Sequence, residues 1–285
     1  MLFFYFTTNE RKSQSVLAKT YSRRCLEKNV KRNFQAEGKA PFLCEVLELS
    51  YFRGTIADAV GAVLPHLCSR RPFAVFTPGA TVAARALTDG ELLTLLRRAD
   101  LLLPDGKGVT LASRLSGAGH LPSIAGIDFA EALFAASAFM ETRVFLYGGA
   151  AGVAERAAAA LRARYPHLII AVSDGFGEDP SERISAFLPH VVCVCLGAGK
   201  QEAWIDENKA SVGGVLLGLG GSLDVWSGDL RRAPRLLRRM GFEWAWRTVR
   251  EPKRVLRLFP LPRYFLRCLA VRQNSKKRNE KSGAV

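Results

Sequence analysis

Four short segments of this 285-residue sequence combine glycines with side chains that could take part in chemistry, and each begins at the end of an apolar run. Asp105 is a carboxylate that could cap a helix or act as a general base. Lys200 and Gln201 could contact a sugar or a phosphate. If the apolar runs are parallel strands, these segments meet at one edge of a sheet, where ligands bind in such folds. The four segments are residues 103–108, 147–152, 196–202 and 218–224.

The segment at 147–152 could hold a phosphate, because Gly148 and Gly149 lead into the amino end of a predicted helix. It resembles a dinucleotide-binding fingerprint, but Tyr147 occupies the first glycine position, so the G-x-G-x-x-G pattern is not met. Asp174 lies near the place of a ribose-binding acid. A nicotinamide-dependent oxidoreductase with a Rossmann domain is therefore an alternative interpretation.

The segment at 218–224 places three glycines, Gly221 among them, beside Asp224. This composition indicates either a backbone that approaches a ligand closely or simply a tight turn. No two aspartates stand in a D-x-D pattern and the four histidines are scattered, so we predict no metal and no cofactor. A departing diphosphate would then be neutralised by arginines and by helix amino ends.

The six cysteines form no C-x-x-C pair, which indicates reduced thiols in the core. Cys193 and Cys195 stand two residues apart in an apolar run, so on a strand both would face the same side.

Short apolar runs alternate with amphipathic stretches along most of the chain, which predicts an α/β fold. The helix at 56–67 would begin after Thr55 and the helix at 91–98 after Asp89. Further helices are predicted at 127–140 and 150–164. Together these elements predict a Rossmann-like, doubly wound and mostly parallel sheet with helices on both faces. The predicted strands are residues 43–49, 73–76, 101–103, 144–147, 168–172, 191–196 and 215–217.

The net charge of +15 is concentrated at the two ends of the chain. Residues 1–40 hold nine Lys/Arg against three Asp/Glu, and residues 229–285 hold seventeen against four, which leaves −4 for the middle. We predict a basic, poorly ordered extension at 1–40, a catalytic domain at 41–228, an arginine-rich appendage at 229–260 and a basic tail at 261–285. The acidic middle argues against nucleic acid as the partner of the basic ends.

Arginines alternate with large apolar residues after Asp229, a pattern that suits an anionic membrane surface. A solvated tail that packs on its own domain is the alternative. Prolines 234, 252, 260 and 262 are expected to cut this region into short helices. The apolar start at residues 1–6 is too short for a signal peptide, and no apolar run approaches the length of a membrane span. We therefore expect a cytoplasmic protein.

Residues 218–257 contain, in order, the patterns GG-x-x-D, G-x-x-x-RAP, G-x-EW-x-x-R and EP-x-R. This series resembles the WecG/TagA/CpsF glycosyltransferases, also called glycosyltransferase family 26. Four upstream patterns extend the resemblance to about residues 43–257: Pro104-Asp-Gly-x-Gly108, Gly126-x-Asp128, Gly148-Gly149 and Lys200-Gln-Glu202.

The resemblance implies a Rossmann-like fold and a metal-independent, inverting transfer during surface or exopolysaccharide synthesis. The donor would be a UDP-sugar of the N-acetylmannosamine type, and the acceptor a sugar on a polyprenyl diphosphate. Asp105 matches the proposed base, and Thr77 matches a threonine that assists it. The positions that match the donor site are Gly148, Gly149, Lys200, Gln201, Gly221 and Asp224.

The resemblance also implies that Arg247, Arg254 and Arg257 belong to an appendage that closes over the site and neutralises the leaving diphosphate. That appendage would touch the inner face of the cytoplasmic membrane, and the protein could form a homo-oligomer. Three positions differ from the usual family pattern, and at one of them the arginine that often stands a few residues before Gly126-x-Asp128 is missing. Gly79 stands where asparagine usually follows Thr-Pro, and Gly199 stands where proline usually precedes Lys-Gln-Glu. The identity of the donor sugar therefore does not follow from the resemblance.

Overall fold

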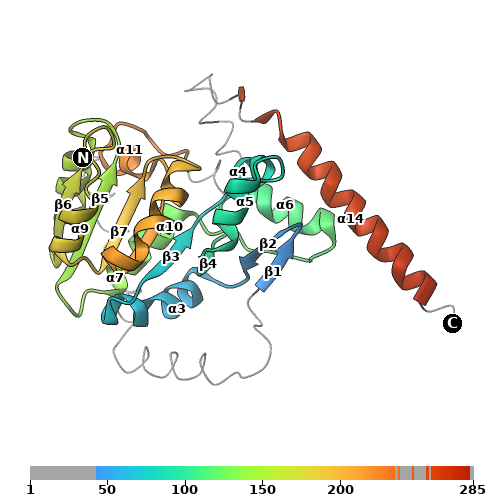
Figure 1. The fold of residues 1–285 in the computed structure, drawn as a ribbon, viewed down its shortest axis with the longest axis horizontal. Helices are drawn as coiled ribbons and strands as arrows, with labels where there is room; N and C mark the ends of the chain where they lie inside the picture. The colour runs from blue at the N-terminus through green and yellow to red at the C-terminus, as the bar shows by residue number, and fades with distance from the viewer. Residues whose placement is uncertain (1–42, 235–236, 238–245, 247–254, 257, 283–285) are drawn as a thin grey trace, which may run out of the picture.

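The fold is a six-stranded parallel sheet covered by helices on both faces, in a computed structural model that describes residues 43–234, 237, 246, 255–256 and 258–282 (Figure 1). The strand order is β4-β3-β8-β7-β5-β6, and every pairing is parallel. This confirms the predicted doubly wound α/β class. The strands are β3 (Phe73–Phe76), β4 (Leu101–Leu102), β5 (Thr142–Gly148), β6 (Leu168–Ser173), β7 (Val191–Cys195) and β8 (Val215–Gly218).

Alternate residues of each strand enter two different cores, because successive side chains of a strand point to opposite faces. Cys193 and Cys195 of β7 lie in the core under α3, α7 and α8, as predicted, whereas Val192 and Val194 lie in the core under α4, α5 and α10. The helices are α3 (Ile56–Ser69), α4 (Ala80–Ala86), α5 (Gly90–Arg97), α6 (Lys107–Ser116), α7 (Gly126–Ala136), α8 (Val153–Arg164), α9 (Ser181–Phe187), α10 (Lys200–Val212), α11 (Ser222–Trp226) and α14 (Leu261–Ser282).

Two helix starts form where the sequence predicts them. The hydroxyl of Thr55 accepts a bond from the Asp58 amide at 3.2 Å, and the Asp58 carboxylate accepts from the Thr55 amide at 2.8 Å. Asp89 accepts from the Leu92 amide at 3.0 Å at the start of α5. These bonds satisfy amides that have no partner inside the helix, so the short polar residues set both boundaries.

The predicted strand at 43–49 is wrong, because the chain reverses within it. Strands β1 (Leu43–Val46) and β2 (Leu49–Phe52) pair antiparallel in a hairpin outside the main sheet. Leu47 turns the chain in the left-handed region at φ 56°. Along β1 exposed and buried residues alternate, which is typical of a strand with one solvated face and not of a strand buried on both faces.

The C-terminal region contains a longer helix than the prolines predict. Helix α14 has 22 residues, and Pro262 lies in its first turn, where a missing amide hydrogen costs nothing. Tyr264 and Cys268, one turn apart, are buried in the core that also contains Tyr51 of β2. Figure 1 shows the rest of α14 extending away from the sheet. The predictions for residues 1–40 and for most of 229–260 lie outside the described residues.

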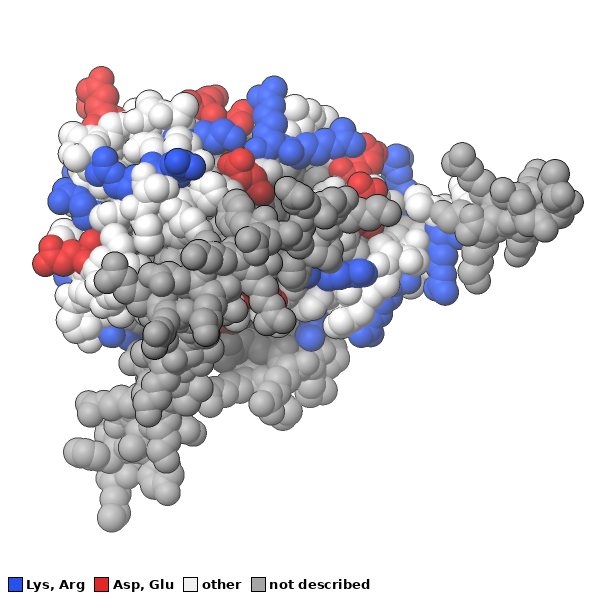
Figure 2. Space-filling view, turned by 90° about the horizontal axis from the view of Figure 1, so that it is seen from below, with Lys and Arg blue, Asp and Glu red and all other residues white. Residues whose placement is uncertain are grey.

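The described surface carries both signs of charge. On the face in Figure 2, lysines and arginines are interspersed with aspartates and glutamates. In the part of the chain that the structure describes, no helix is long and apolar enough to cross a membrane.

The described cysteines are free thiols. Cys44, Cys193, Cys195 and Cys268 are buried, and burial raises the pKa of Cys195 to about 12. Cys68 is exposed, so the prediction of a core thiol is wrong for this residue, and Cys25 lies outside the described residues. A thiol with so high a pKa stays protonated and unreactive, as expected for a residue that only fills the core.

Candidate functional site

The predicted site residues gather at the carboxyl edge of the parallel sheet. The Thr77 hydroxyl, just after β3, donates to the carbonyl of Gly218 at the end of β8, at 2.9 Å. Gly79 and Asp105 form a parallel bridge beyond the ends of β3 and β4. The Gly220 amide donates to the Gln201 side chain at 2.9 Å. Three contacts between residues distant in sequence therefore join the turns after β3, β4, β7 and β8.

Thr77 and Asp105 are both partly exposed at this edge. The hydrogen bond to Gly218 fixes the orientation of the Thr77 side chain. A side-chain carbon built on Gly126 would lie 2.9 Å from Thr77 Oγ1, so the first residue of α7 must be small for the threonine to keep its place. The bridge with Gly79 continues the β3–β4 pairing as far as Asp105. The carboxylate and the hydroxyl are thus carried by adjacent strand ends.

Gln201 and Glu202 are buried at the start of α10 and form a chain of hydrogen bonds. The Gln201 amide oxygen accepts from the Gly220 amide, and its nitrogen donates to Glu202 Oε1 at 2.9 Å. Glu202 Oε2 accepts from the Gly199 amide at 2.6 Å. Burial raises the pKa of Glu202. The Gln201 amide atoms thereby shape the turn after β8, while Lys200 beside them is exposed.

The Gly148–Gly149 turn follows β5 and is tightly packed. Gly148 has φ 124°, and a side-chain carbon there would collide with the carbonyl of Cys195. Gly149 has φ 74°, and its carbonyl accepts from the Gly175 amide at 3.0 Å. The turn leads into α8, whose amino end has no side-chain cap. Uncapped amides at a helix start are free to meet an anion.

Asp174 is engaged by its own loop. Its Oδ1 accepts from the amides of Phe176 and Gly177 at 3.0 and 3.1 Å. The carboxylate therefore stabilises the turn after β6, and this arrangement does not favour a ribose contact.

Gly221 immediately precedes α11, and Asp224 lies within it, next to the Gly148–Gly149 turn. A side-chain carbon on Gly149 would lie 3.7 Å from Leu223. The Asp224 carbonyl accepts from the Leu230 amide at 2.7 Å, which closes the turn after α11. Arg247, Arg254 and Arg257 lie outside the described residues.

An ion pair between α7 and the segment after α11 was not predicted as part of the site. Arg232 contacts Asp128 through both guanidinium nitrogens, at 2.5 and 3.1 Å. Both residues belong to patterns that carry the family resemblance, Gly126-x-Asp128 and the arginine of RAP. That shared membership was the only signal in the sequence, and it does not reveal that the two patterns meet.

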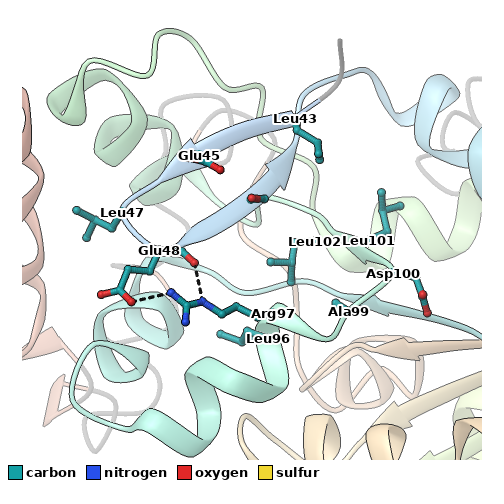
Figure 3. Close-up of a pocket in the computed structure, with 11 residues that line it drawn as sticks. Leu43, Glu45, Leu47, Glu48, Leu96, Arg97, Ala99, Asp100, Leu101 and Leu102 are labelled. Carbon is teal, nitrogen blue, oxygen red and sulfur yellow. Dashed lines mark hydrogen bonds and ion pairs between the residues drawn. The ribbon is translucent and has the colours of Figure 1, made fainter. Parts of the chain in front are cut away.

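A cavity of about 530 Å³ lies between the β1–β2 hairpin, α5 and β4. Its lining includes Asp100 and Leu101 at the beginning of β4, whereas Asp105 follows the end of that strand. Figure 3 shows the Arg97 guanidinium bonded to the carbonyl and carboxylate of Glu48. The cavity therefore lies at the edge of the sheet opposite Asp105, away from the predicted site residues. Among the described residues no cluster of His, Cys, Asp or Glu is arranged to hold a metal ion.

A doubly wound parallel sheet with glycine turns gathered at its carboxyl edge defines a Rossmann-like domain, a fold in which ligands bind at that edge. The chain belongs to the glycosyl transferase WecG/TagA/CpsF family, whose profile matches residues 44–279. It is therefore a glycosyltransferase, as the patterns predict.

Three relatives carry the same name, N-acetylglucosaminyldiphosphoundecaprenol N-acetyl-beta-D-mannosaminyltransferase. The protein of Bacillus subtilis strain 168 is 31% identical over 234 residues, which cover 80% of this chain and 91% of the relative. That of Bacillus spizizenii is 34% identical over 195 residues, 67% of this chain and 76% of the relative. That of Staphylococcus aureus strain MW2 is 31% identical over 209 residues, 71% of this chain and 82% of the relative.

The packing of Gly148 predicts that Gly148→Ala destabilises the protein by about 2–4 kcal/mol, through positive-φ strain and collision with the Cys195 carbonyl. Gly61→Ala is the matched control. Gly61 lies inside α3 with open space around it, so alanine should stabilise by about 0.5–1 kcal/mol. Urea unfolding of both variants measures the difference, and a Gly148→Ala protein as stable as wild type would contradict this reading of the turn.

Proposed function

We propose that this chain is an inverting, metal-independent glycosyltransferase that moves a hexose or N-acetylhexosamine, of the N-acetylmannosamine type, from a UDP-sugar to a sugar on a polyprenyl diphosphate. The product would enter surface polysaccharide or exopolysaccharide synthesis. The observation that carries the proposal is the meeting of Thr77, Asp105 and the Gly218–Gly220 turn at one sheet edge, in a chain of this family. The names of the relatives support the acceptor and the sugar type.

In the proposed reaction, Asp105 accepts the proton of the acceptor hydroxyl while that oxygen attacks the anomeric carbon of the donor. The bond to the UDP oxygen breaks with its electron pair, and a single displacement inverts the anomeric configuration. Thr77 supports this step because its bond to Gly218 fixes the strand end beside Asp105. A positioned carboxylate suits the role, because the hydroxyl becomes more acidic as its oxygen bonds to the anomeric carbon, so even a weak base can take the proton.

The leaving UDP carries negative charge that the site must neutralise. The Gly148–Gly149 turn and the start of α8 offer backbone amides, and Lys200 offers a cation at the start of α10. We assign Gln201, Gly221 and Asp224 to the donor side. The segment that holds Gly221 and Asp224 contacts α10 through the Gly220–Gln201 bond and lies against Gly149 through Leu223. Arg247, Arg254 and Arg257 would complete the neutralisation from the appendage.

The C-terminal helix supports a position at the inner face of the cytoplasmic membrane. Leu266 is 67% exposed on α14, and Leu269 and Val271 are also exposed. Arg263 and Arg267 are exposed on the same helix, and Arg267 also lies 3.6 Å from the carboxylate of Glu48. A helix that exposes both apolar residues and arginines can bind anionic lipid. The apolar side chains insert into the membrane, and the arginines pair with the headgroups.

Asp105→Asn should lower the turnover of sugar transfer by at least about 10²-fold, because an amide cannot accept the proton. Binding of UDP should change little. Asp100→Asn is the control, since Asp100 precedes the same strand and accepts from the Ala74 amide at the opposite edge. Initial rates and UDP titration calorimetry measure both effects. Near-normal turnover of Asp105→Asn would exclude it as the base.

UDP release with a panel of UDP-sugars and a synthetic polyprenyl-diphosphate N-acetylglucosamine acceptor should depend on the acceptor and survive EDTA. Acceptor dependence distinguishes transfer from donor hydrolysis, and the donor with the highest rate identifies the sugar. Product analysis by NMR of the anomeric proton reports inversion or retention. Loss of activity in EDTA that added Mg²⁺ restores would contradict the metal-independent mechanism.

Leu266→Glu should lower binding to vesicles of anionic phospholipid by about tenfold or more. A leucine side chain that moves from water into the lipid contributes about 1.5–3 kcal/mol to the binding free energy. Phe139→Glu is the control, as Phe139 is a comparably exposed apolar residue just after α7. Sedimentation with the vesicles measures the bound fraction. Equal binding of wild type and Leu266→Glu would show that α14 is not the contact surface.

A further inference from the structure

Helix α7 connects the candidate site with the segment that leaves the catalytic domain. Its first residue, Gly126, lies against Thr77 and Leu219. Its third residue, Asp128, holds Arg232. One turn further along, Glu131 accepts from the indole nitrogen of Trp226 at 3.0 Å. One rigid helix therefore touches the predicted catalytic threonine and also the chain after α11.

The Asp128–Arg232 pair is better suited to fix a position than other ion pairs nearby. Its two parallel contacts set both the distance and the orientation of the guanidinium, and the Arg232 and Asp128 side chains are 19% and 37% exposed. Asp229, three residues before Arg232, pairs with Arg156 of α8, but the Asp229 and Arg156 side chains are 46% and 51% exposed. Exposed pairs are screened by water and contribute little.

The segment that Arg232 anchors lies between two other contacts. The Leu230 amide donates to the Asp224 carbonyl at 2.7 Å. The Arg231 carbonyl accepts from the Trp246 indole at 3.3 Å, and Ala233 is buried. Arg232 therefore fixes a short stretch of backbone that contacts α11 on one side and Trp246 on the other. Trp246 immediately precedes Arg247 in the sequence.

We infer that Asp128 and Arg232 are positioning residues for the transfer reaction: their ion pair fixes the segment at 230–232 on α7 and so sets where Trp246 lies relative to Thr77. The inference rests on the proposed function. The pair acts by geometry and not by contact with the reacting atoms. A misplacement of about 1 Å in an active site can cost a factor of about 100 in rate, so loss of the pair should affect turnover.

The test compares Asp128→Asn, Arg232→Gln and the double variant in the full-length protein. Each single change should lower kcat by about 10- to 100-fold. The donor KM should stay within about threefold of wild type, because the glycine turns remain intact. The double variant should be no slower than either single variant, since both remove the same interaction. Arg232→Lys, which keeps the charge but not the two-point contact, should fall between wild type and Arg232→Gln.

Arg156→Gln is the matched control, because it removes the exposed ion pair to the same segment. Its kcat should stay within about twofold of wild type. Hydrogen exchange of the amides at 230–233 gives a readout independent of activity. Exchange should be faster in Asp128→Asn and Arg232→Gln than in wild type or Arg156→Gln, with melting temperatures that stay close to each other.

Three outcomes would overturn the inference: single variants with near-normal kcat, additive losses in the double variant, or unchanged exchange at 230–233. If either asparagine or glutamine variant does not fold, Arg232→Lys with its measured kcat and exchange decides the question. If wild type transfers no sugar from any donor, the proposed function fails, and the exchange rates still show whether the ion pair holds the segment.

Discussion

Parallel pairing of the strands is the constraint on which the rest of this structure depends. Adjacent parallel strands must be joined by crossover connections, so each strand ends at the same edge and is followed there by a turn into a helix. The residues with possible chemistry lie in these turns or at the strand and helix ends beside them. Thr77, Asp105, Gly148 and Gly220 are far apart in the sequence and meet because the backbone hydrogen bonds align the strands.

Close contact between the turns requires glycine at a few positions and buried polar groups at others. Gly126 makes room for Thr77, and Gly148 makes room for the carbonyl of Cys195. Gln201 and Glu202 enter the space below the turns and satisfy the amides of Gly199 and Gly220. The negative charge of a buried carboxylate is costly, and these bonds offset the cost. These contacts hold the turns of the site edge against one another.

The sequence predicts those parts of the fold that depend on local interactions. Thr55 and Asp89 cap helices through bonds to residues three positions away, so their role is visible without a structure. The hairpin at 43–52 was missed because an apolar run hid the period-two alternation and the left-handed turn at Leu47. Helix α14 was expected to be interrupted because a proline was treated as a breaker without regard to its place in the first turn. The Asp128–Arg232 pair spans 104 residues, and no local pattern encodes such a contact.

The contacts at the site join residues that are far apart in the sequence, and this affects how the newly made chain folds. Strand β3, the first strand of the sheet in the chain, pairs directly with β8, the last, and the hydrogen bond from Thr77 to Gly218 spans 141 residues. During synthesis, β8 must therefore be made before β3 can pair with it. Pairing over so long a distance is slow compared with helix formation. A chain that lacks β8 also lacks the Gly218 carbonyl that holds Thr77, so the site needs both ends of the sheet-forming sequence.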